Sequence, residues 1–378
     1  MTECDNNGTM AGGKRIKICL IVASPEIIGG HSVQASRLSR GLSAEPGINV
    51  ESLWINPRLP GILRHLKRIK YVRTVTTLAA YVVVLLIRLR TADLVHVFAA
   101  SYWSFLLGPA PAVIVARLYR KPVVLNYHSG EARDHLARWR TALPIMRLAN
   151  MIVVPSLFLV DVFAGFHLKA VAVPNTVDPD VFRFKQRDPL GQTVLCNRNL
   201  EPNYDVGCTL RAFALVENEA SSARLIVVGD GSQADDLRRL AVHLGLRNID
   251  FIGAVDPGRM PEIYADADIF VNSSIVDCMP LSILEALACG LPVVTTSPGG
   301  IPYIVRHNEN GLLVSPGDHE QLARGILSVL RDRELAVRLI KGAIFSITGR
   351  YKIRPVPTVF ALLEVLAAPC FSACISTL

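Results

Sequence analysis

The eight cysteines of this 378-residue sequence include no CxxC pair. A zinc ribbon or zinc finger is therefore not indicated, because such sites take their ligands from closely spaced cysteines. Cys19 and Cys196 lie in apolar runs that are typical of buried strands. This placement favours core thiols in a reducing compartment over a disulfide framework.

Two glycine-rich nucleotide motifs are missing as well. No G-x-G-x-x-G follows the first apolar run, so a dinucleotide cofactor is not indicated, and the Walker A pattern is absent. Asp266 and Asp268 form an Asp-x-Asp pair, but they stand at the start of a predicted strand, where a turn explains them. We therefore expect neither a cofactor nor a bound metal.

Charged residues are scarce, at 19% of the chain against 51% hydrophobic residues. This balance excludes a disordered chain and fits an α/β protein with buried parallel strands. The length predicts two domains, each large enough for its own core. No signal peptide is predicted, because residues 1–13 are polar and glycine-rich and the first apolar run, Ile16–Ala23, has the length of a strand. We expect a cytoplasmic protein.

Acidic residues are missing from residues 58–73, RLPGILRHLKRIKYVR, which hold six Lys or Arg in a chain of net charge +8. The longest apolar run, Leu78–Ile87, follows, and its ten residues are about half of what a bilayer span needs. Because residues 74–87 carry no charge, a short span stays open as an alternative. One interpretation is a solvated face followed by a core helix. The other, which we favour, is attraction to anionic lipid and peripheral attachment to the inner face of the cell membrane. A nucleic-acid partner is not expected, because aromatics are few here and no binding motif occurs.

Short apolar runs alternate with helix-like segments along both halves of the chain, and this order predicts parallel sheets. The predicted strands of the first half are Arg15–Ser24, Asn49–Ile55, Asp93–Phe98, Pro122–Tyr127, Met151–Pro155 and Ala170–Val173. Those of the second half are Thr193–Asn197, Arg224–Gly229, Ile249–Ile252, Asp268–Asn272, Pro292–Thr296 and Gly311–Val314. We predict an α/β protein of two tandem Rossmann-like, doubly wound domains, 14–185 and 186–350. They would face a cleft at the carboxyl edges of the strands, where ligands bind. An atypical tail, 351–378, has no assigned function.

The segment 267–299 carries the strongest chemical signal. Pro280 is predicted at the first position of a helix that runs to Cys289 and that Gly290 ends. The start of such a helix offers unpaired N–H groups and the positive end of its dipole to phosphate oxygens. The segment therefore suits the diphosphate of a nucleotide sugar.

Two carboxylates accompany this helix, Asp277 before it and Glu285 within it, eight positions apart. A carboxylate accepts paired hydrogen bonds from a vicinal diol, so one can bind a ribose and the other a transferred sugar. The alternative is that Asp277 only caps the helix and that Glu285 is a solvated helix residue.

This stretch resembles the E-x7-E region of family 4 glycosyltransferases, which are retaining enzymes of the two-Rossmann-domain GT-B type. Residues 225–274 are similar throughout to that family's strand, GDG turn, helix and ADIFV strand. Residues 173–182, VPNTVDPDVF, look like its interdomain PNGVD-x-x-F segment, and residues 126–129 look like its strand-end histidine. The resemblance implies the GT-B fold and a nucleoside diphosphate sugar as donor.

The resemblance also implies roles for individual side chains. Glu285 would hold the ribose hydroxyls, and Asp277 would face the donor sugar. Arg198 would grip the diphosphate, and His128 would lie beside the reacting sugar. His128, Arg198 and Asp277 are thus the predicted catalytic residues.

Backbone groups would complete the donor site. Gly29 and Gly30 would let the chain approach the diphosphate closely, and the amides of residues 278–281 would meet sugar hydroxyls and phosphate. Glycines around Asp230 would suit close packing near the ligand, whereas Asp230 itself is explained by a tight turn. The backbone contributors predicted are Gly29, Gly30, Gly229, Gly231, Cys278, Met279, Pro280 and Leu281.

We therefore predict a retaining, metal-independent hexosyltransferase that acts on a cell-surface polysaccharide or a lipid-linked glycan. Arg198, the helix start and the glycine loop would stabilise the charge on the leaving diphosphate. Residues 174–182 would act as a hinge for closure on the donor.

Four departures from the family pattern leave alternatives open. Asp277 is shorter than the usual Glu, no lysine follows Arg198 within residues 199–204, Tyr303 stands where an acid is common, and the tail is unusual. A non-catalytic nucleotide-sugar-binding protein and a sugar-nucleotide epimerase are the two alternatives.

Overall fold

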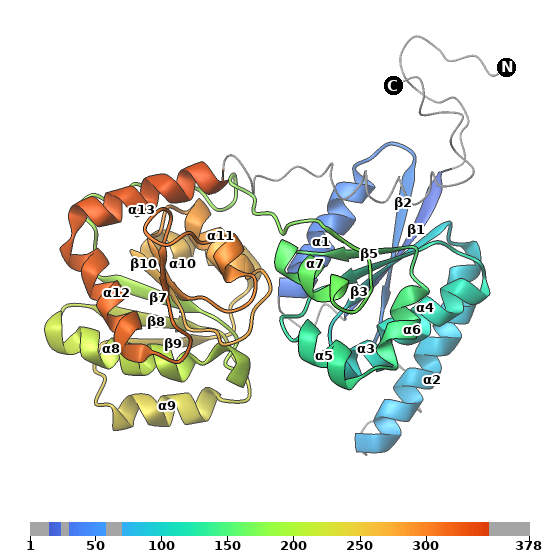
Figure 1. Ribbon diagram of the computed structural model, residues 1–378, viewed down its shortest axis with the longest axis horizontal. Coiled ribbons are helices and arrows are strands. Elements are labelled where there is room, and N and C mark those ends of the chain that lie inside the picture. The colour runs from blue at the N-terminus through green and yellow to red at the C-terminus, as the bar shows by residue number, and fades with distance from the viewer. Residues whose placement is uncertain (1–14, 24–29, 58–69, 348–378) are drawn as a thin grey trace, which may run out of the picture.

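Two parallel sheets form the framework of the molecule. The structure, a computed structural model, describes residues 15–23, 30–57 and 70–347. Figure 1 shows each sheet inside its own α/β body, one formed by the first half of the chain and one by the second, with the two bodies side by side. The predicted fold of two tandem doubly wound domains is confirmed.

The first sheet has six parallel strands in the order β2-β1-β3-β4-β5-β6. Most of its strands consist of buried Val, Ile and Leu, as expected where helices cover both faces of a parallel sheet. Its strands are β1 (Ile16–Val22), β2 (Ile48–Trp54), β3 (Leu94–Ala99), β4 (Val123–Tyr127), β5 (Met151–Val154) and β6 (Ala170–Ala172).

The second sheet also has six parallel strands, in the order β12-β11-β10-β7-β8-β9. Counted from its own first strand, this is the Rossmann order, which reverses between the first and fourth strands, here β7 and β10. Its strands are β7 (Thr193–Asn197), β8 (Arg224–Val228), β9 (Ile249–Gly253), β10 (Ile269–Asn272), β11 (Val293–Thr296) and β12 (Leu312–Val314).

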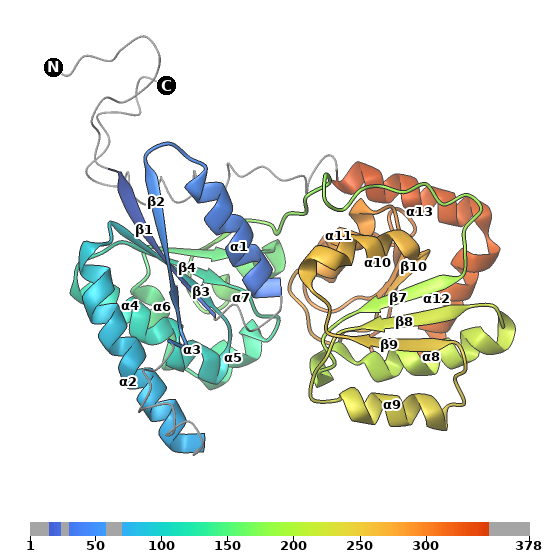
Figure 2. The ribbon, with the colours of Figure 1, turned by 180° about the vertical axis from the view of Figure 1, so that it is seen from behind.

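Helices flank both sheets, as Figure 2 shows from behind. Those of the first body are α1 (Gly30–Ser43), α2 (Lys70–Arg88), α3 (Tyr102–Leu107), α4 (Pro109–Leu118), α5 (Ala132–Arg138), α6 (Ala142–Arg147) and α7 (Leu157–Ala164). Those of the second are α8 (Val206–Glu219), α9 (Ala234–His243), α10 (Met260–Asp266), α11 (Leu281–Ala288), α12 (His319–Arg331) and α13 (Arg333–Ser346).

All twelve predicted strands are present, with ends that differ by one or two residues at most. Apolar runs of strand length between turn-forming residues were a sufficient signal. The chain crosses between the sheets through residues 173–192, which contain the predicted boundary near residue 186; that boundary stays a prediction. The glycine Gly29, most of the basic segment 58–73 and the tail lie outside the described residues.

The predicted ten-residue apolar run lies within a longer helix, α2. Among the described residues, the stretch Val72–Thr91 is long and apolar enough to cross a membrane, and 17% of its window is buried. The apolar run in the sequence is shorter than this stretch, because the helix continues through the uncharged threonines before Leu78, which add little polarity.

Candidate nucleotide-sugar site

The second sheet brings Arg198 and the segment 273–280 together. Arg198 follows β7, and Ser273 follows β10. These two strands are neighbours in the sheet although β8 and β9 come between them in the sequence. Both loops therefore leave the same carboxyl edge at the point where the strand order reverses, which is where open α/β sheets bind ligands.

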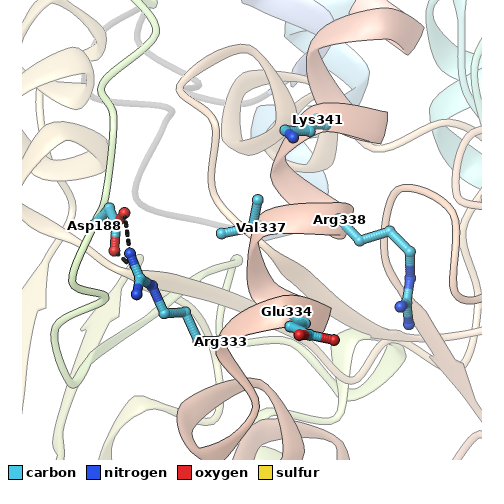
Figure 3. A pocket seen from close by; sticks show the side chains of 6 residues that line it. All are labelled: Asp188, Arg333, Glu334, Val337, Arg338 and Lys341. Atoms are coloured by element: carbon cyan, nitrogen blue, oxygen red, sulfur yellow. Dashed lines mark hydrogen bonds and ion pairs between the residues drawn. The ribbon is translucent and has the colours of Figure 1, made fainter.

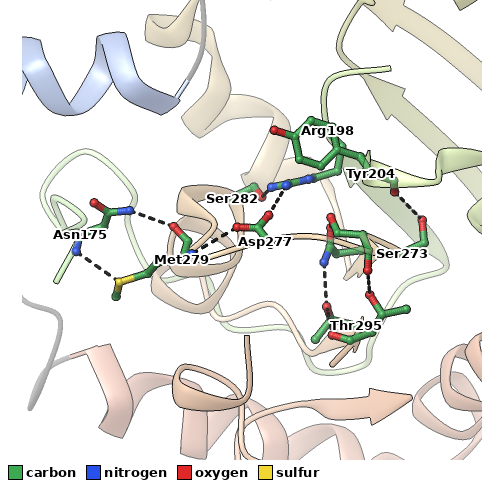
Figure 4. A network of polar contacts seen from close by, with 11 residues as sticks. Asn175, Arg198, Tyr204, Ser273, Asp277, Met279, Ser282 and Thr295 are labelled. Carbon is green, nitrogen blue, oxygen red and sulfur yellow. Dashed lines mark hydrogen bonds and ion pairs between the residues drawn. The ribbon is translucent and has the colours of Figure 1, made fainter. Parts of the chain in front are cut away.

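Arg198 and Asp277 form a buried ion pair at this edge, and each side chain is 9% exposed (Figure 4). The guanidinium also donates to Ser282 Oγ at 3.1 Å, and its Cζ lies 4.1 Å from the ring centroid of Tyr204. Burial acts against the charge, but the Asp277 carboxylate and the other neighbours outweigh it and raise the pKa of Arg198. Two of the predicted catalytic groups thus neutralise each other.

One donor of this arginine is left over. The buried Nε of Arg198 has no hydrogen-bond partner among the residues that the structure describes. Buried donors are nearly always satisfied in folded proteins, so a water molecule or a ligand oxygen would be the natural acceptor for this N–H.

Helix α11 begins one residue later than predicted. Pro280 has an extended backbone, with φ −67° and ψ 124°, and is the residue before the helix, which starts at Leu281. Asp277 does not cap α11; it accepts a hydrogen bond from Met279 N at 3.2 Å, so the capping interpretation of Asp277 is wrong. The short turn through residues 277–280, fixed by Arg198 at one end, delays the helix.

The start of α11 has no side-chain cap. Its first N–H groups therefore lack the side-chain acceptor that ends of helices usually have, which suits an anion. Of the amides predicted to contact the donor, that of Met279 is used by Asp277. Pro280 was expected to donate a backbone hydrogen bond to the donor, which is wrong because proline has no N–H. Leu281 is the first residue of the uncapped helix, so its N–H has no side-chain acceptor.

Glu285 is buried rather than solvated, at 8% exposure. Its carboxylate accepts a hydrogen bond from the Tyr264 hydroxyl at 3.2 Å and lies 3.5 Å from a guanidinium nitrogen of Arg37. Burial raises the pKa of Glu285 to about 7, against the lowering effects of Arg37 and Tyr264. The solvated interpretation is therefore wrong, and a buried carboxyl on α11 faces the first domain.

Arg37 was missed in the sequence. It lies on α1 and donates to the Thr176 carbonyl at 2.6 Å, so one side chain contacts the first domain, the interdomain connection and Glu285. No motif marks it, because its role depends on how α1 and α11 meet in space. Both views of the ribbon show α1 and α11 at the junction of the two bodies.

The predicted glycines divide into two groups. Gly30 is the first residue of α1, and a Cβ there would lie 3.6 Å from Leu281 Cδ1, so Gly30 faces the start of α11. Gly229 has φ +134°, and a Cβ there would lie 2.1 Å from the carbonyl oxygen of Arg198. A Cβ at Gly231 would lie 2.5 Å from the carbonyl oxygen of Leu200. Gly229 and Gly231 therefore have to be glycines because the backbone of residues 198–200 packs directly against them.

His128 follows β4 at the carboxyl edge of the first sheet. It is 8% exposed, its Nε2 lies 2.7 Å from Asn126 Oδ1, and its ring stacks on Phe98 at 5.7 Å between centroids. Two residues later, a Cβ on Gly130 would lie 2.9 Å from Asp277 N, so the loop that carries His128 packs directly on the Asp277 loop.

The loop 273–280 is held from both domains. Cys278 packs into the hydrophobic core of the first domain, although its neighbours in sequence belong to the second. Asn175 Nδ2 donates to the Met279 carbonyl at 2.9 Å. Tyr303, the residue in place of the family acid, contacts Asp161 of α7 at 3.4 Å. The predicted site thus lies at a packed contact between the domains.

A cavity of about 530 Å³ opens beside this contact. Its volume is within the usual range for small-molecule sites. Glu131, Arg133 and Asp134 line it from the first domain, and Asp277 and Gly299 line it from the second. The cavity therefore connects the predicted donor loop with charged groups of the other domain.

A second cavity, of about 570 Å³, lies on the outer side of α13 (Figure 3). Its lining combines the exposed ion pair of Asp188 and Arg333 with Glu334, Arg338 and Lys341, three more long charged side chains of one helix. None of the predicted site residues lines it, and its charged walls are exposed, whereas the interdomain cavity includes Asp277 in its lining.

Residues 180–344 match the family described as glycosyl transferases group 1. A GDP-mannose-dependent alpha-(1-6)-phosphatidylinositol monomannoside mannosyltransferase of Mycobacterium tuberculosis is 30% identical over 185 residues, 44% of this chain and 48% of that protein. The sulfoquinovosyl transferase SQD2 of Arabidopsis thaliana is 27% identical over 70% of this chain and 55% of its own length. The chain thus spans about half the length of these curated relatives.

Solved structures extend the likeness to both domains. Anabaena Alr3699/HepE in complex with UDP-glucose superposes with a TM-score of 0.75 at 19% identity, covering 93% of this chain and all of that one. Sucrose-phosphate synthase from Thermosynechococcus elongatus gives 0.73 at 19% identity, with 94% and 100% covered. These likenesses show the GT-B fold. The sequence match to the glycosyl transferases group 1 family is thus confined to residues 180–344, the domain that contains Arg198, Asp277 and Glu285, whereas the GT-B fold extends over both domains.

Proposed function

We propose that this protein transfers a hexosyl unit from a nucleoside diphosphate sugar, with retention at the anomeric carbon and without a metal ion. One observation carries the proposal: Arg198, the uncapped start of α11 and buried Glu285 converge at the strand-order reversal of a Rossmann sheet. This combination provides a cation, open N–H groups and a carboxyl for the three parts of a sugar nucleotide.

The chemistry follows from where charge develops. As the anomeric bond breaks, negative charge builds on the diphosphate, and fixed donors stabilise it most where water is excluded. The start of α11 and the unsatisfied Nε of Arg198 are such donors. Asp277 would exchange its pairing with Arg198 for hydroxyls of the donor sugar, and His128 would lie on the opposite side of that sugar. Gly30 would allow the diphosphate to approach α1 closely.

For the acceptor, we propose a lipid-linked glycan or a growing cell-surface polysaccharide, bound in the interdomain cavity at the inner face of the cell membrane. The carboxylates of Glu131 and Asp134 line this cavity and can accept hydrogen bonds from the hydroxyl groups of a glycan. A mycobacterial relative is named for mannosyl transfer to a phosphatidylinositol mannoside, and a Rhizobium meliloti relative for lipopolysaccharide core biosynthesis. Both names concern lipid-linked acceptors, which supports this class of substrate.

A non-catalytic sugar-nucleotide-binding protein is the second candidate. The observation that favours it is the ion pair between Arg198 and Asp277, because a cation already paired with a carboxylate is less available to a diphosphate. An epimerase of the same fold is a third, and it would release a changed sugar nucleotide without an acceptor.

The test is a panel of UDP-, GDP- and ADP-sugars measured by thermal shift on the purified chain, followed by transfer and donor-hydrolysis assays. A ligand at about 100 times its Kd stabilises the native state by about 2.7 kcal/mol. We expect one donor to raise Tm and to be turned over. Glu285→Gln should lose most of both effects, whereas Glu320→Gln, on an exposed ion pair of α12, should keep them.

The outcomes separate the three candidates. Binding that Glu285→Gln weakens, without transfer to any acceptor extract and without hydrolysis, supports the non-catalytic protein. Conversion of one sugar nucleotide into its epimer supports the third candidate. If no sugar nucleotide raises Tm, the proposal and both of its alternatives are wrong.

A further inference from the structure

Helix α2 has an apolar surface on the side where a soluble helix is normally polar. Its inner side is buried through Tyr81 and Leu85, which are fully enclosed, as is Leu89 directly after the helix. Val75, Val83 and Ile87 point the other way and are 67%, 54% and 62% exposed. These positions are multiples of four apart, so with Ala79 they form a stripe about 18 Å long. A helix that is apolar on both sides requires a second apolar environment.

Helix α4 extends this surface. Ile114 and Leu118, one turn apart on α4, are 49% and 70% exposed. Two hydrogen bonds fix α2 beside α4: the Tyr81 hydroxyl donates to the Gly108 carbonyl at 3.1 Å, and the Tyr119 hydroxyl donates to the Leu86 carbonyl at 2.9 Å. Figures 1 and 2 both show α2 alongside α4 at the outer edge of the first domain. We call this surface, residues 75–87 of α2 with Ile114 and Leu118 of α4, the α2–α4 face.

The charge around the face is mostly positive, although Glu51 of β2 forms an ion pair with Arg88 at the end of α2. Residues 52–130 hold eleven Lys or Arg and a single acid, Asp93. Asp93 accepts a hydrogen bond from the backbone N–H of Lys17, in β1. Because the Tyr119 bond to Leu86 brings the carboxyl ends of α2 and α4 together, exposed Arg90, Arg117 and Arg120 gather at that end of the face.

We propose that the α2–α4 face lies flat on an anionic lipid bilayer, with its apolar stripe in the acyl boundary and its arginines at the headgroups. An interfacial helix has this composition, apolar on one side with Lys and Arg at its border. A second copy of the chain fits less well, because a symmetric contact would oppose the same arginines. A span is disfavoured because the buried side of α2 belongs to the domain core.

Co-sedimentation of the full chain with phosphatidylcholine vesicles, with and without phosphatidylglycerol, tests the proposal. Binding should require the anionic lipid and fall with salt. Arg117→Gln with Arg120→Gln should weaken it by about 30-fold at low salt, since each cation near such a surface contributes about 1 kcal/mol. Val83→Glu with Ile87→Glu should weaken it at least about 10-fold.

The matched control is Val242→Glu on α9 of the second domain, where Val242 is 81% exposed. It introduces a glutamate at an exposed apolar site outside the α2–α4 face and should leave vesicle binding unchanged. Circular dichroism and Tm of each variant show that the fold is kept. Sugar-nucleotide binding should also be unchanged, so this test can fail while the proposed transfer from a sugar nucleotide stands, and the reverse; only the proposed position at the inner face of the membrane rests on both.

Three results would overturn the proposal. The first is a wild-type chain that does not bind anionic vesicles. The second is a dimer that Val83→Glu with Ile87→Glu converts to a monomer in the absence of lipid binding, which would assign the face to a second copy. The third is a chain that stays in membranes after an alkaline carbonate wash, which would mean that α2 spans the bilayer.

Discussion

Glu285 is a carboxyl group whose surroundings disfavour its charge. Within the part of the chain that the structure describes, the polar partners of its carboxylate are Tyr264 and Arg37, and Arg37 at 3.5 Å does not offset the effect of burial. Its pKa near 7 therefore makes its charge state sensitive to neutral pH. A sugar nucleotide that displaced Arg37 and donated ribose hydroxyls would change that balance.

The raised pKa of Glu285 has a consequence for stability. The folded state binds the proton up to about pH 7, whereas the unfolded chain releases it near its usual value of 4.5. Stability from this group is thus present below pH 4.5 and lost as pH rises to 7, by about 3 kcal/mol in total. Glu285→Gln should remove this slope, so its Tm relative to wild type should rise between pH 5 and pH 8. A constant difference would contradict the assignment.

The buried pair of Arg198 and Asp277 predicts a second effect. Asp277→Ala leaves a buried guanidinium without its carboxylate and should lower the free energy of unfolding by about 3 kcal/mol. Arg198→Met combined with the same Asp277→Ala should lower it by clearly less than the sum of the two single changes, because both buried charges are then gone. Urea unfolding of the single and double variants measures this. Additive losses would show that the pair is not coupled in the folded state.

At the scale of elements, the site depends on loops that pack backbone against backbone. The turn after β11, residues 297–300, lies against the 277–278 loop so closely that Cβ atoms have no room. A Cβ on Gly299 would lie 2.1 Å from the Asp277 carbonyl oxygen, and one on Gly300 would lie 1.7 Å from that of Cys278. This contact, with the hydrogen bond from Gly300 N to Asp277 O, fixes the position of the 277–278 loop relative to the sheet.

Two glycines with positive φ allow the cost of backbone strain to be measured apart from the cost of a steric clash. Gly317 has φ +79° with nothing within 4 Å of a Cβ, whereas Gly299 has φ +53° and the close contact to Asp277. Gly317→Ala should cost about 1 kcal/mol from backbone strain alone. Gly299→Ala should cost about 3 kcal/mol and also weaken sugar-nucleotide binding, because the Asp277 loop must shift. Equal losses in stability and unchanged binding for both variants would refute this account.

At the scale of the whole molecule, few polar contacts join the two domains in the described residues near the site. The Arg37 bonds to Thr176 and Glu285 join α1, the interdomain connection and α11. Asn175 holds Met279, and Cys278 inserts into the first core. Closure and donor binding therefore involve the same groups, which is the arrangement expected where ligand binding drives domain closure.

Arg37→Met should loosen this contact while leaving each domain folded. We expect a larger radius of gyration by solution X-ray scattering in the absence of ligand, and its return to the wild-type value with saturating donor. Arg40→Met, an exposed change on the same helix, is the control and should scatter like wild type. An unchanged radius for Arg37→Met would mean that the other contacts suffice to keep the domains together.

The sequence alone determined the strands, the two-domain order and the segment that holds the helix start with Asp277 and Glu285. These signals are local: apolar runs define strands, and glycine and proline define ends of helices. The same signals misplaced the start of α11 by one residue and left the burial of Glu285 open, because both depend on contacts made by other parts of the chain.

Only the tertiary structure decided the partners of those residues. The strand order set Arg198 beside Asp277 across about eighty residues of chain, and the approach of α1 to α11 gave Glu285 its neighbour Arg37. The sequence showed that α2 is apolar. Which of its apolar residues are exposed depends on which side of the helix packs on α4. Local pattern determines what a segment forms, whereas charge state and exposure depend on what the fold brings next to it.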